Sequence, residues 1–414
     1  MKSVLIVSYF FPPAGAVQRP LKIAAHLAAR GVETHVLAPD DPKWTYADTS
    51  GSIPPLVHVH RVRNFGPRAR RLADELYGKR GIALGRTHLR HLPPRLLVPD
   101  EFVPWLLTAA PAAIRLTRRH RIDVVMTSSS PSSVHMIGAM VKRGTGAAWV
   151  ADVRDSLVSN PDRRVERTLV RLKQSGEFAV ANLVARYADG IVAATARIAN
   201  EFDALRPSAP VALIQNGCDF ADFTGLDYSP GVRFRLTHTG SFYGERDPRP
   251  VLGAVARSGL DITMRFVGDF RPRDRAYAEA LELGDRLELL GYVDRRRSLE
   301  LQRDSEALLL LIQDAKGRGR GVVTAKVFEY LAAGRPILAA VPLDGEAAAI
   351  VREAGAGDVV RPDDVTAITN SLVSMVERFE QGSLEAVRLS PEAKDRLSRE
   401  RRLEELEALL GNVA

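Results

Sequence analysis

Two charged side chains three residues apart, Lys326 and Glu329, are the strongest candidates for ligand binding in this sequence. The apolar residues around them recur at the spacing of a short helix that begins near Thr324. Side chains three apart lie on neighbouring parts of one helix face. Gly334 is suited to end this helix in a left-handed conformation, and the following Arg-Pro starts a strand. The pattern therefore predicts a helix that presents a cation and a carboxylate together.

The loop before this helix adds glycine and positive charge. Residues 316–321 read Lys-Gly-Arg-Gly-Arg-Gly. Free backbone N–H groups at a helix N-terminus, with cations beside them, suit a diphosphate. Glu329 lies one turn further along, where it can accept hydrogen bonds from ribose hydroxyls. A surface helix with a solvated ion pair explains these residues equally well on physical grounds alone.

Polar residues also follow two strands predicted in the first half of the chain. One loop, 127–135, reads Thr-Ser-Ser-Ser-Pro-Ser-Ser-Val-His, and the other carries Asp152, Arg154 and Asp155. Ligands of open α/β sheets bind beyond the carboxyl ends of the strands, and half-buried charges there need partners. We expect Asp152, Arg154 and Asp155 to shape the reaction centre. His135 is a further catalytic candidate, although a structural role also explains it.

The first loop of the chain, 10–20, contains three prolines and Gly15. A glycine there lets the backbone approach a donor phosphate or an acceptor closely. A turn that needs flexibility explains the same residue. The loop lacks the Gly-x-Gly-x-x-Gly spacing, which disfavours a nicotinamide cofactor.

Strand-length apolar runs alternate with helical patterns along the whole chain. The first half has predicted strands at 2–8, 32–38, 122–127, 147–152 and 190–195. After the linker-like residues 206–210, strands resume at 235–239, 264–268, 287–291, 306–312 and 336–341. Such alternation predicts the α/β class with doubly wound parallel sheets. We expect one Rossmann-like domain at 1–205, a second at 206–390, and a terminal helix at 391–414 that packs back toward the first domain.

The charge of the chain implies an anionic partner. The 414 residues carry a net charge of +8, and the isoelectric point is near 9.7. Basic residues concentrate at 61–95 with apolar side chains between them, which suits an anionic membrane surface and a lipid-linked acceptor. A solvated arginine-rich insertion explains this stretch equally well. Sparse aromatic residues and the lack of a recognisable motif disfavour nucleic acid.

Cysteine content and hydropathy narrow the class further. The single cysteine, Cys218, excludes an internal disulfide framework and a cysteine-rich zinc site, while sites built from His, Asp and Glu stay open. The apolar runs are far shorter than the roughly 20 residues of a spanning helix, and the N-terminus lacks the pattern of a signal peptide. We therefore expect a cytoplasmic protein, peripheral at the inner face of the membrane if 61–95 binds lipid.

The segment around Lys326 and Glu329 resembles the donor-binding signature of retaining GT-B glycosyltransferases, in the family-4-like group of bacterial cell-envelope, polysaccharide and natural-product enzymes. The resemblance extends over nearly the whole chain. Residues 214–220, Ile-Gln-Asn-Gly-Cys-Asp-Phe, resemble the interdomain segment, and 239–246, Thr-Gly-Ser-Phe-Tyr-Gly-Glu-Arg, the glycine turn of the second domain. The resemblance implies two Rossmann-like domains facing each other across a cleft. It implies transfer of a sugar, with retention of configuration, from a nucleoside diphosphate to a hydroxyl acceptor, and no metal or other cofactor.

The resemblance also implies roles for individual residues. Glu329 matches the glutamate that holds the nucleotide ribose, and Arg246 and Lys326 match cations that stabilise the departing diphosphate. Arg154 takes the position at which related enzymes often have a histidine facing the transferred sugar. The residues implied to bind the donor are Gly15, Gly240, Arg246, Gly268, Tyr292, Val293, Thr324, Lys326 and Glu329.

One position departs from the family pattern. Many members have two glutamates separated by seven residues, the first of which contacts donor-sugar hydroxyls, and this chain has Gly321 at the first position. Two other functions share the architecture and stay open. One is a sugar-nucleotide epimerase, which needs paired carboxylates and a histidine to abstract a proton. The other is a catalytically silent partner in a polysaccharide assembly complex.

Overall fold

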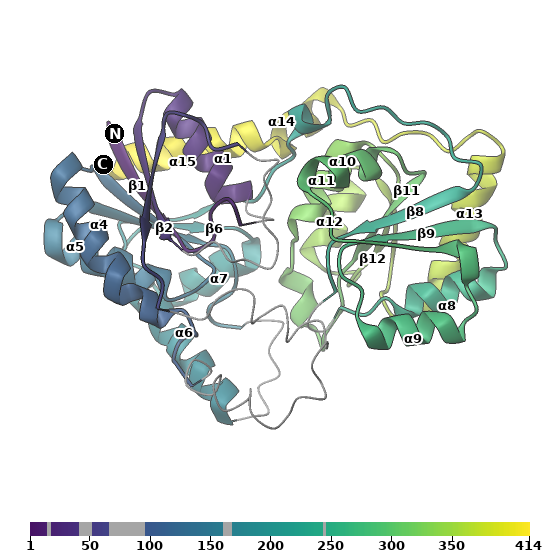
Figure 1. Cartoon of the computed structure of the whole chain (residues 1–414), viewed down its shortest axis with the longest axis horizontal. Coiled ribbons are helices and arrows are strands. Elements are labelled where there is room, and N and C mark those ends of the chain that lie inside the picture. Colours follow the sequence, from purple (N-terminus) through teal and green to yellow (C-terminus); the bar gives the residue numbers. More distant parts are fainter. Residues whose placement is uncertain (15–17, 41–51, 66–95, 160–167, 243–245) are drawn as a thin grey trace. The chain divides into compact units, whose positions relative to one another are not determined.

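The computed structural model describes the chain except for residues 15–17, 41–51, 66–95, 160–167 and 243–245. The described residues form two compact units (Figure 1). The first comprises the described residues up to Gln215 together with Arg402–Ala414, and the second is Asn216–Arg401. Gly15 and the 66–95 part of the basic stretch lie outside the described residues, so the predictions made for them stay predictions.

The first unit contains a seven-stranded parallel sheet with the order β3-β2-β1-β4-β5-β6-β7. Its strands are β1 (Ser3–Ser8), β2 (Glu33–Pro39), β3 (Val57–Val62), β4 (Val124–Ser128), β5 (Ala148–Val153), β6 (Gly190–Ala193) and β7 (Val211–Leu213). The continuous apolar runs predicted as strands form five of these. The two edge strands, β3 and β7, were missed, because β3 buries only its first residue fully and β7 has only three residues.

Helices cover both faces of this sheet (Figure 1). They are α1 (Gln18–Ala29), the short η1 (Val103–Trp105), α4 (Leu106–His120), α5 (Val134–Thr145), α6 (Thr168–Tyr187) and α7 (Ala196–Ala204). On one face, Val4 and Ile6 of β1 form a core with α1 and with Leu406 and Leu410 near the end of the chain. The opposite face packs on α4 and α5, where Trp105 is fully buried.

The C-terminal helix predicted at 391–414 is two helices. Helix α14 (Pro391–Leu397) ends where Ser398 is extended, and α15 (Arg399–Val413) follows directly. The break lets the backbone of Cys218 accept a hydrogen bond from the N–H of Arg399 and donate one to Leu397. Helix α15 therefore begins in the second unit, and its remainder belongs to the first.

The second unit contains a six-stranded parallel sheet with the order β10-β9-β8-β11-β12-β13. Its strands are β8 (Phe234–Thr239), β9 (Ile262–Val267), β10 (Leu287–Gly291), β11 (Ala307–Leu311), β12 (Ile337–Ala340) and β13 (Gly357–Val360). The first five match the predicted strands, and β13, which is only partly buried, was missed. Both sheets reverse their winding beside a central strand, at β1/β4 and at β8/β11, and such points are where open α/β sheets bind ligands.

Two cores flank the second sheet. Its helices are α8 (Arg249–Ser258), α9 (Pro272–Ala280), α10 (Arg295–Arg303), α11 (Ala325–Ala333), α12 (Glu346–Glu353) and α13 (Val365–Glu380), with short turns η2 (Phe220–Phe223), η3 (Gly284–Arg286) and η4 (Arg318–Gly321). One core joins the sheet to α8 and α13, and the other joins it to α11 and α12. Within the described ranges, no helix is long and apolar enough to cross a membrane.

Candidate active site

Glycine turns join three strand ends of the second sheet. Gly240 follows β8, Gly268 follows β9 and Gly291 ends β10, and all three have positive φ angles. The N–H of Gly240 donates to the carbonyl of Val267 over 2.6 Å, and that of Gly268 donates to Gly291 over 2.7 Å. A Cβ atom on Gly268 would lie 2.6 Å from the carbonyl carbon of Gly240. These turns therefore require glycine, and they expose backbone at the winding switch of the sheet.

The N-terminus of α11 meets this turn through Lys326. A Cβ atom on Gly240 would lie 2.5 Å from Nζ of Lys326, so the ammonium group rests directly on the glycine backbone. Thr324 is the N-cap residue, and no hydrogen-bond partner of its buried hydroxyl is found in the described part of the chain. The first N–H groups of a helix also lack partners within the helix. Backbone donors, a hydroxyl and a cation thus converge beside Gly240.

The charges around Lys326 indicate an anion site. Burial, and after it the positive charge of Arg246, lower the pKa of Lys326 to about 7, while Glu329 acts in the opposite direction. Two cations that disfavour each other in this way are stabilised when a diphosphate binds between them. His238, beneath the turn, stays neutral, because burial and the charge of Lys326 lower its pKa to about 3.

Glu329 is held by an arginine that the sequence analysis did not identify. Its carboxylate accepts a hydrogen bond from Nη1 of Arg295 over 2.7 Å, and Nη2 of Arg295 donates to Asp222 over 2.7 Å. Burial opposes the charge of Arg295, but Glu329 and Asp222 raise its pKa above the ordinary value. Glu329 is therefore neither paired with Lys326 nor a free surface charge. It is an oriented carboxylate that stays 22% exposed and can accept bonds from a ligand.

Helix α11 has the predicted local structure. It spans Ala325–Ala333, with Thr324 as N-cap and Gly334 in the left-handed conformation as C-cap. The preceding loop closes into η4, which ends at Gly321, where a family member often has its first glutamate. Tyr292 and Val293 follow Gly291 directly and are half-buried. The second unit thus brings most of the predicted donor-binding residues to one edge of its sheet.

In the first unit, Asp152 is enclosed. It is completely buried and accepts hydrogen bonds from Nη2 of Arg19 over 2.8 Å and from the hydroxyl of Ser128 over 2.7 Å. Arg19, itself nearly buried, also donates to the carbonyl of Ile214 over 2.9 Å. Asp152 therefore ties the start of α1 to the ends of β4 and β5. Because Asp152 is completely buried, its position does not support a direct contact with substrate.

His135 is equally enclosed. Its Nδ1 lies 2.9 Å from the hydroxyl of Thr127, which also accepts a hydrogen bond from the indole of Trp149. Burial lowers the pKa of His135 to about 4, partly offset by Asp152, so the imidazole is neutral. His135 is therefore placed to stabilise the serine loop, residues 127–135, rather than to contact a ligand.

Arg154 and Asp155 are accessible at the same strand end. Asp155 is exposed and accepts a hydrogen bond from the hydroxyl of Ser130. Arg154 is half-buried, and its backbone N–H donates to Ser129 over 3.2 Å. Asp100 stabilises the serine loop, because its carboxylate accepts hydrogen bonds from Ser132 and Ser133. Asp100 was missed because it lies about thirty residues upstream, outside any local motif.

Cys218 and Asp219 have structural contacts. Burial raises the pKa of the Cys218 thiol to about 12, so the thiol is protonated and is not a nucleophile. Asp219 accepts a hydrogen bond from Nε of Arg399 over 2.7 Å. A Cβ atom on Gly217 would lie 2.5 Å from Cα of Arg399, so the Asn-Gly-x-Asp segment needs its glycine to pack on the start of α15.

Comparison with known proteins gives a family and a fold. Residues 14–217 match the family model of the glycosyl transferase 4-like domain. The Anabaena protein HepE in complex with UDP-glucose is similar in structure, with a TM-score of 0.67, 14% identity and 99% of each chain covered. The lipopolysaccharide outer core galactosyltransferase WaaB has a TM-score of 0.59, 12% identity and 99% coverage of each chain. A putative UDP-N-acetylglucosamine 2-epimerase from Listeria monocytogenes has a TM-score of 0.56 and 12% identity, with 99% of this chain and 96% of that chain covered. No curated protein sequence matches the chain significantly.

The two doubly wound sheets and these structural likenesses define the GT-B fold. Residues 14–217 therefore match the glycosyl transferase 4-like family, and the whole chain has the GT-B fold that the resemblance implied.

Proposed function

We propose that the protein transfers a sugar from a nucleoside diphosphate to a hydroxyl acceptor with retention of configuration. The observation that carries the donor assignment is the meeting of Lys326 and the α11 N-terminus with the Gly240 turn. A diphosphate there would accept hydrogen bonds from backbone N–H groups and from Thr324, beside two cations. The solved structures of HepE with UDP and UDP-glucose support a uridine nucleotide as the first donor to test.

The charge balance suits a departing diphosphate. Cleavage of the glycosidic bond leaves negative charge on the nucleotide, and preorganised cations stabilise charge that develops in a transition state. Lys326 and Arg246 supply these cations, so we expect donor binding to need no metal ion. Glu329, oriented by Arg295, would bind the ribose hydroxyls.

The accessible strand end of the first unit supports an acceptor or sugar site at Arg154 and Asp155. Asp152 and His135, which are enclosed, would act as positioning residues for this edge. Burial of the same two residues weighs against the epimerase, which needs an accessible carboxylate and histidine for proton abstraction. A catalytically silent partner would bind the nucleotide but transfer no sugar. In that case Gly321, in place of a glutamate, would be the reason that the donor sugar is not held.

A nucleotide panel tests the donor site. Melting curves are recorded with UDP, GDP and dTDP at millimolar concentration, in the presence of a chelator. A ligand that binds only the folded state raises stability by RT ln(1 + [L]/Kd), so we expect one nucleotide to raise the melting temperature most. If none of the three shifts it, the donor site is refuted.

A turnover assay then separates the three functions. Sugar nucleotides of the preferred base are incubated with and without acceptor alcohols, and the anomer of the product is read by NMR. Turnover that requires an acceptor and retains configuration supports the proposal. Interconversion of the sugar nucleotide without acceptor indicates the epimerase, and tight binding without turnover indicates the silent partner.

A further inference from the structure

Four of the chain's nine histidines gather at one edge of the first sheet. His35 lies on β2, His58 and His60 lie on β3, and His120 is the last residue of α4. His35 is directly opposite His58 in the strand register, and alternate residues of a strand share a face, so His58 and His60 point to the same side. The rings of His35 and His120 have centroids 4.3 Å apart. Clustering this close from three elements is not explained by the donor or acceptor sites.

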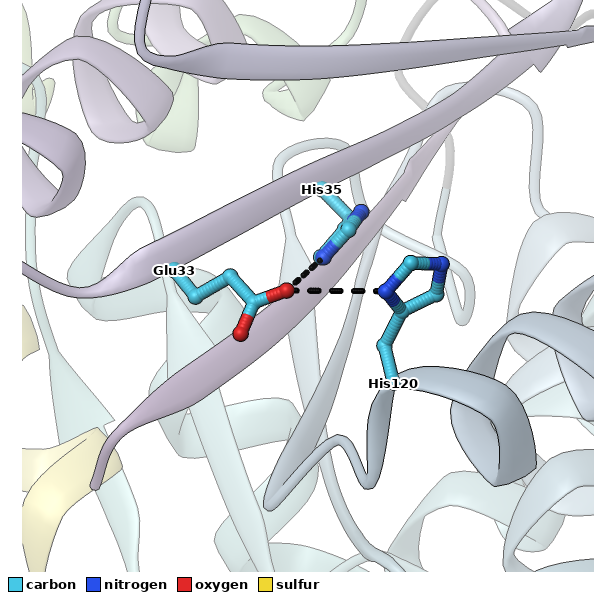
Figure 2. Close-up of side chains that lie close together, drawn as sticks. All are labelled: Glu33, His35 and His120. Atoms are coloured by element: carbon cyan, nitrogen blue, oxygen red, sulfur yellow. Dashed lines mark hydrogen bonds and ion pairs between the residues drawn. The ribbon is translucent and has the colours of Figure 1, made fainter.

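A carboxylate completes the cluster (Figure 2). Oε1 of Glu33 lies 2.9 Å from Nε2 of His35 and 3.5 Å from Nδ1 of His120. The three ligand atoms all lie within 4.8 Å of one another. Zinc binds nitrogen and oxygen at about 2.0–2.2 Å, so two ligands of a tetrahedral ion are roughly 3.4 Å apart. The spacing of these atoms is thus close to that of a coordination sphere.

The surroundings orient His35 as a ligand. Its other nitrogen, Nδ1, lies 2.9 Å from Nε2 of His60, and the side chain is only 2% exposed. Histidines that bind metals usually have this second nitrogen held by a neighbouring group.

The cluster is also reachable and electrostatically suited to a cation. Glu33 is 49% exposed and His120 is 27% exposed, so an ion can enter from solvent. His120 ends α4, and the C-terminus of a helix carries partial negative charge that stabilises a cation. Arg118 and Arg119 in the same turn oppose this, but both are exposed and therefore screened by solvent.

We infer that Glu33, His35 and His120 form a binding site for a divalent transition-metal ion, with zinc as the best match and water as the fourth ligand. Two imidazoles and one carboxylate favour zinc over magnesium or calcium, which prefer oxygen ligands. Glu33 is the first residue of β2 and so lies where the strands of this parallel sheet begin, whereas Arg154 and Asp155 lie where the strands end. The ion would therefore be structural and would link β2 to the end of α4, separate from the proposed donor site.

The test is zinc binding by the full chain without an affinity tag, after removal of metals with a chelator. Calorimetric titration with zinc chloride should give one ion per chain with a dissociation constant in the micromolar range or below. Glu33→Gln and His120→Gln each remove one ligand from a partly exposed position. His26→Gln is the matched control, because His26 also lies 2.9 Å from a glutamate, Glu407, and the described residues place no third ligand beside that pair.

We expect at least about tenfold weaker zinc binding in Glu33→Gln and His120→Gln, and unchanged binding in His26→Gln. Zinc should raise the melting temperature of the wild type and the control only. Cobalt should give the visible absorption of a tetrahedral nitrogen and oxygen site in the same two proteins. If the wild type shows no saturable binding below 100 µM zinc, on the order of a weak surface site, or if all four proteins bind zinc alike, the site does not exist.

Discussion

Nucleotide binding should depend on pH through Lys326. Burial and Arg246 lower the pKa of this lysine from 10.5 to about 7. A bound diphosphate supplies negative charge beside the ammonium group and raises the pKa again. Above pH 7 the free protein therefore has a neutral Lys326 and the complex a charged one. Binding must then take up a proton, and affinity must fall as pH rises.

The expected size follows from these values. If the bound pKa is close to the ordinary value, affinity falls by up to about tenfold for each pH unit above 7. A group with a pKa near 7 is still partly charged at pH 7.5, so the dependence is shallower there, and we expect roughly 20-fold weaker binding at pH 9 than at pH 7.5. A terminal phosphate titrates near pH 6, so the nucleotide itself keeps a constant charge over this range. Lys326→Arg keeps a permanent charge and should bind with almost the same affinity across the range.

Isothermal titration with the preferred nucleoside diphosphate measures both the affinity and the number of protons taken up on binding. Repeating the titration at pH 8 in buffers of different ionisation enthalpy should give close to one proton taken up per nucleotide by the wild type, and close to none by Lys326→Arg. Circular dichroism at each pH checks that the fold is retained. Equal pH dependence in the two proteins, or no proton uptake by the wild type, would refute the placement of the diphosphate at Lys326.

Three further variants test the site and its support. Glu329→Ala should weaken nucleotide binding by about tenfold or more, the loss of a charge-assisted hydrogen bond, while the melting temperature stays within a few degrees; unchanged affinity would make Glu329 a surface residue. Gly268→Ala should destabilise the protein by about 1–3 kcal/mol in denaturant unfolding, because its φ is +125° and its Cβ would contact backbone. Gly411→Ala, in a helix with open space around it, should be neutral or slightly stabilising, and an equal effect of both would contradict the close packing of the turn. Asp152→Asn should destabilise the protein by about 3 kcal/mol, since it leaves a buried arginine without its carboxylate. Asp155→Asn should leave stability unchanged and lower turnover, and the reverse pattern would exchange the roles of the two aspartates.

The sequence was sufficient to predict the fold because central parallel strands are buried on both faces. Val4–Val7 and Leu308–Leu311 are continuous apolar runs for this reason, and both are strands. Strand β3 was missed because only Val57 is fully buried in it, and His58 and His60 interrupt its apolar residues.

Only those parts of the candidate site that lie within one short stretch of sequence could be predicted. Thr324, Lys326, Glu329 and Gly334 lie within one helix and its caps, so their spacing alone predicts their arrangement. The partners that decide their chemistry come from elsewhere in the chain. Arg295 is 34 residues from Glu329, and nothing in a run of three arginines distinguishes it from its neighbours.

The same limit applied to the first unit. Arg19 and Asp152 are 133 residues apart in the sequence, and their ion pair depends on the folded sheet. Without that partner, Asp152 could only be interpreted by its place at a strand end. Burial then distinguishes Asp152 from Asp155, although the two lie three residues apart.

Helix α15 has a consequence for how the protein is made. Leu406 and Leu410 belong to the core of the first unit, yet a ribosome synthesises them only after the entire second unit. One face of the first sheet must therefore stay partly uncovered while nearly two hundred residues are added, at about 5–20 residues per second. Each leucine contributes about 1.5–3 kcal/mol when it is buried. The first unit is thus a domain that begins to fold early and completes its core last, and during that interval its apolar sheet face is open to chaperones.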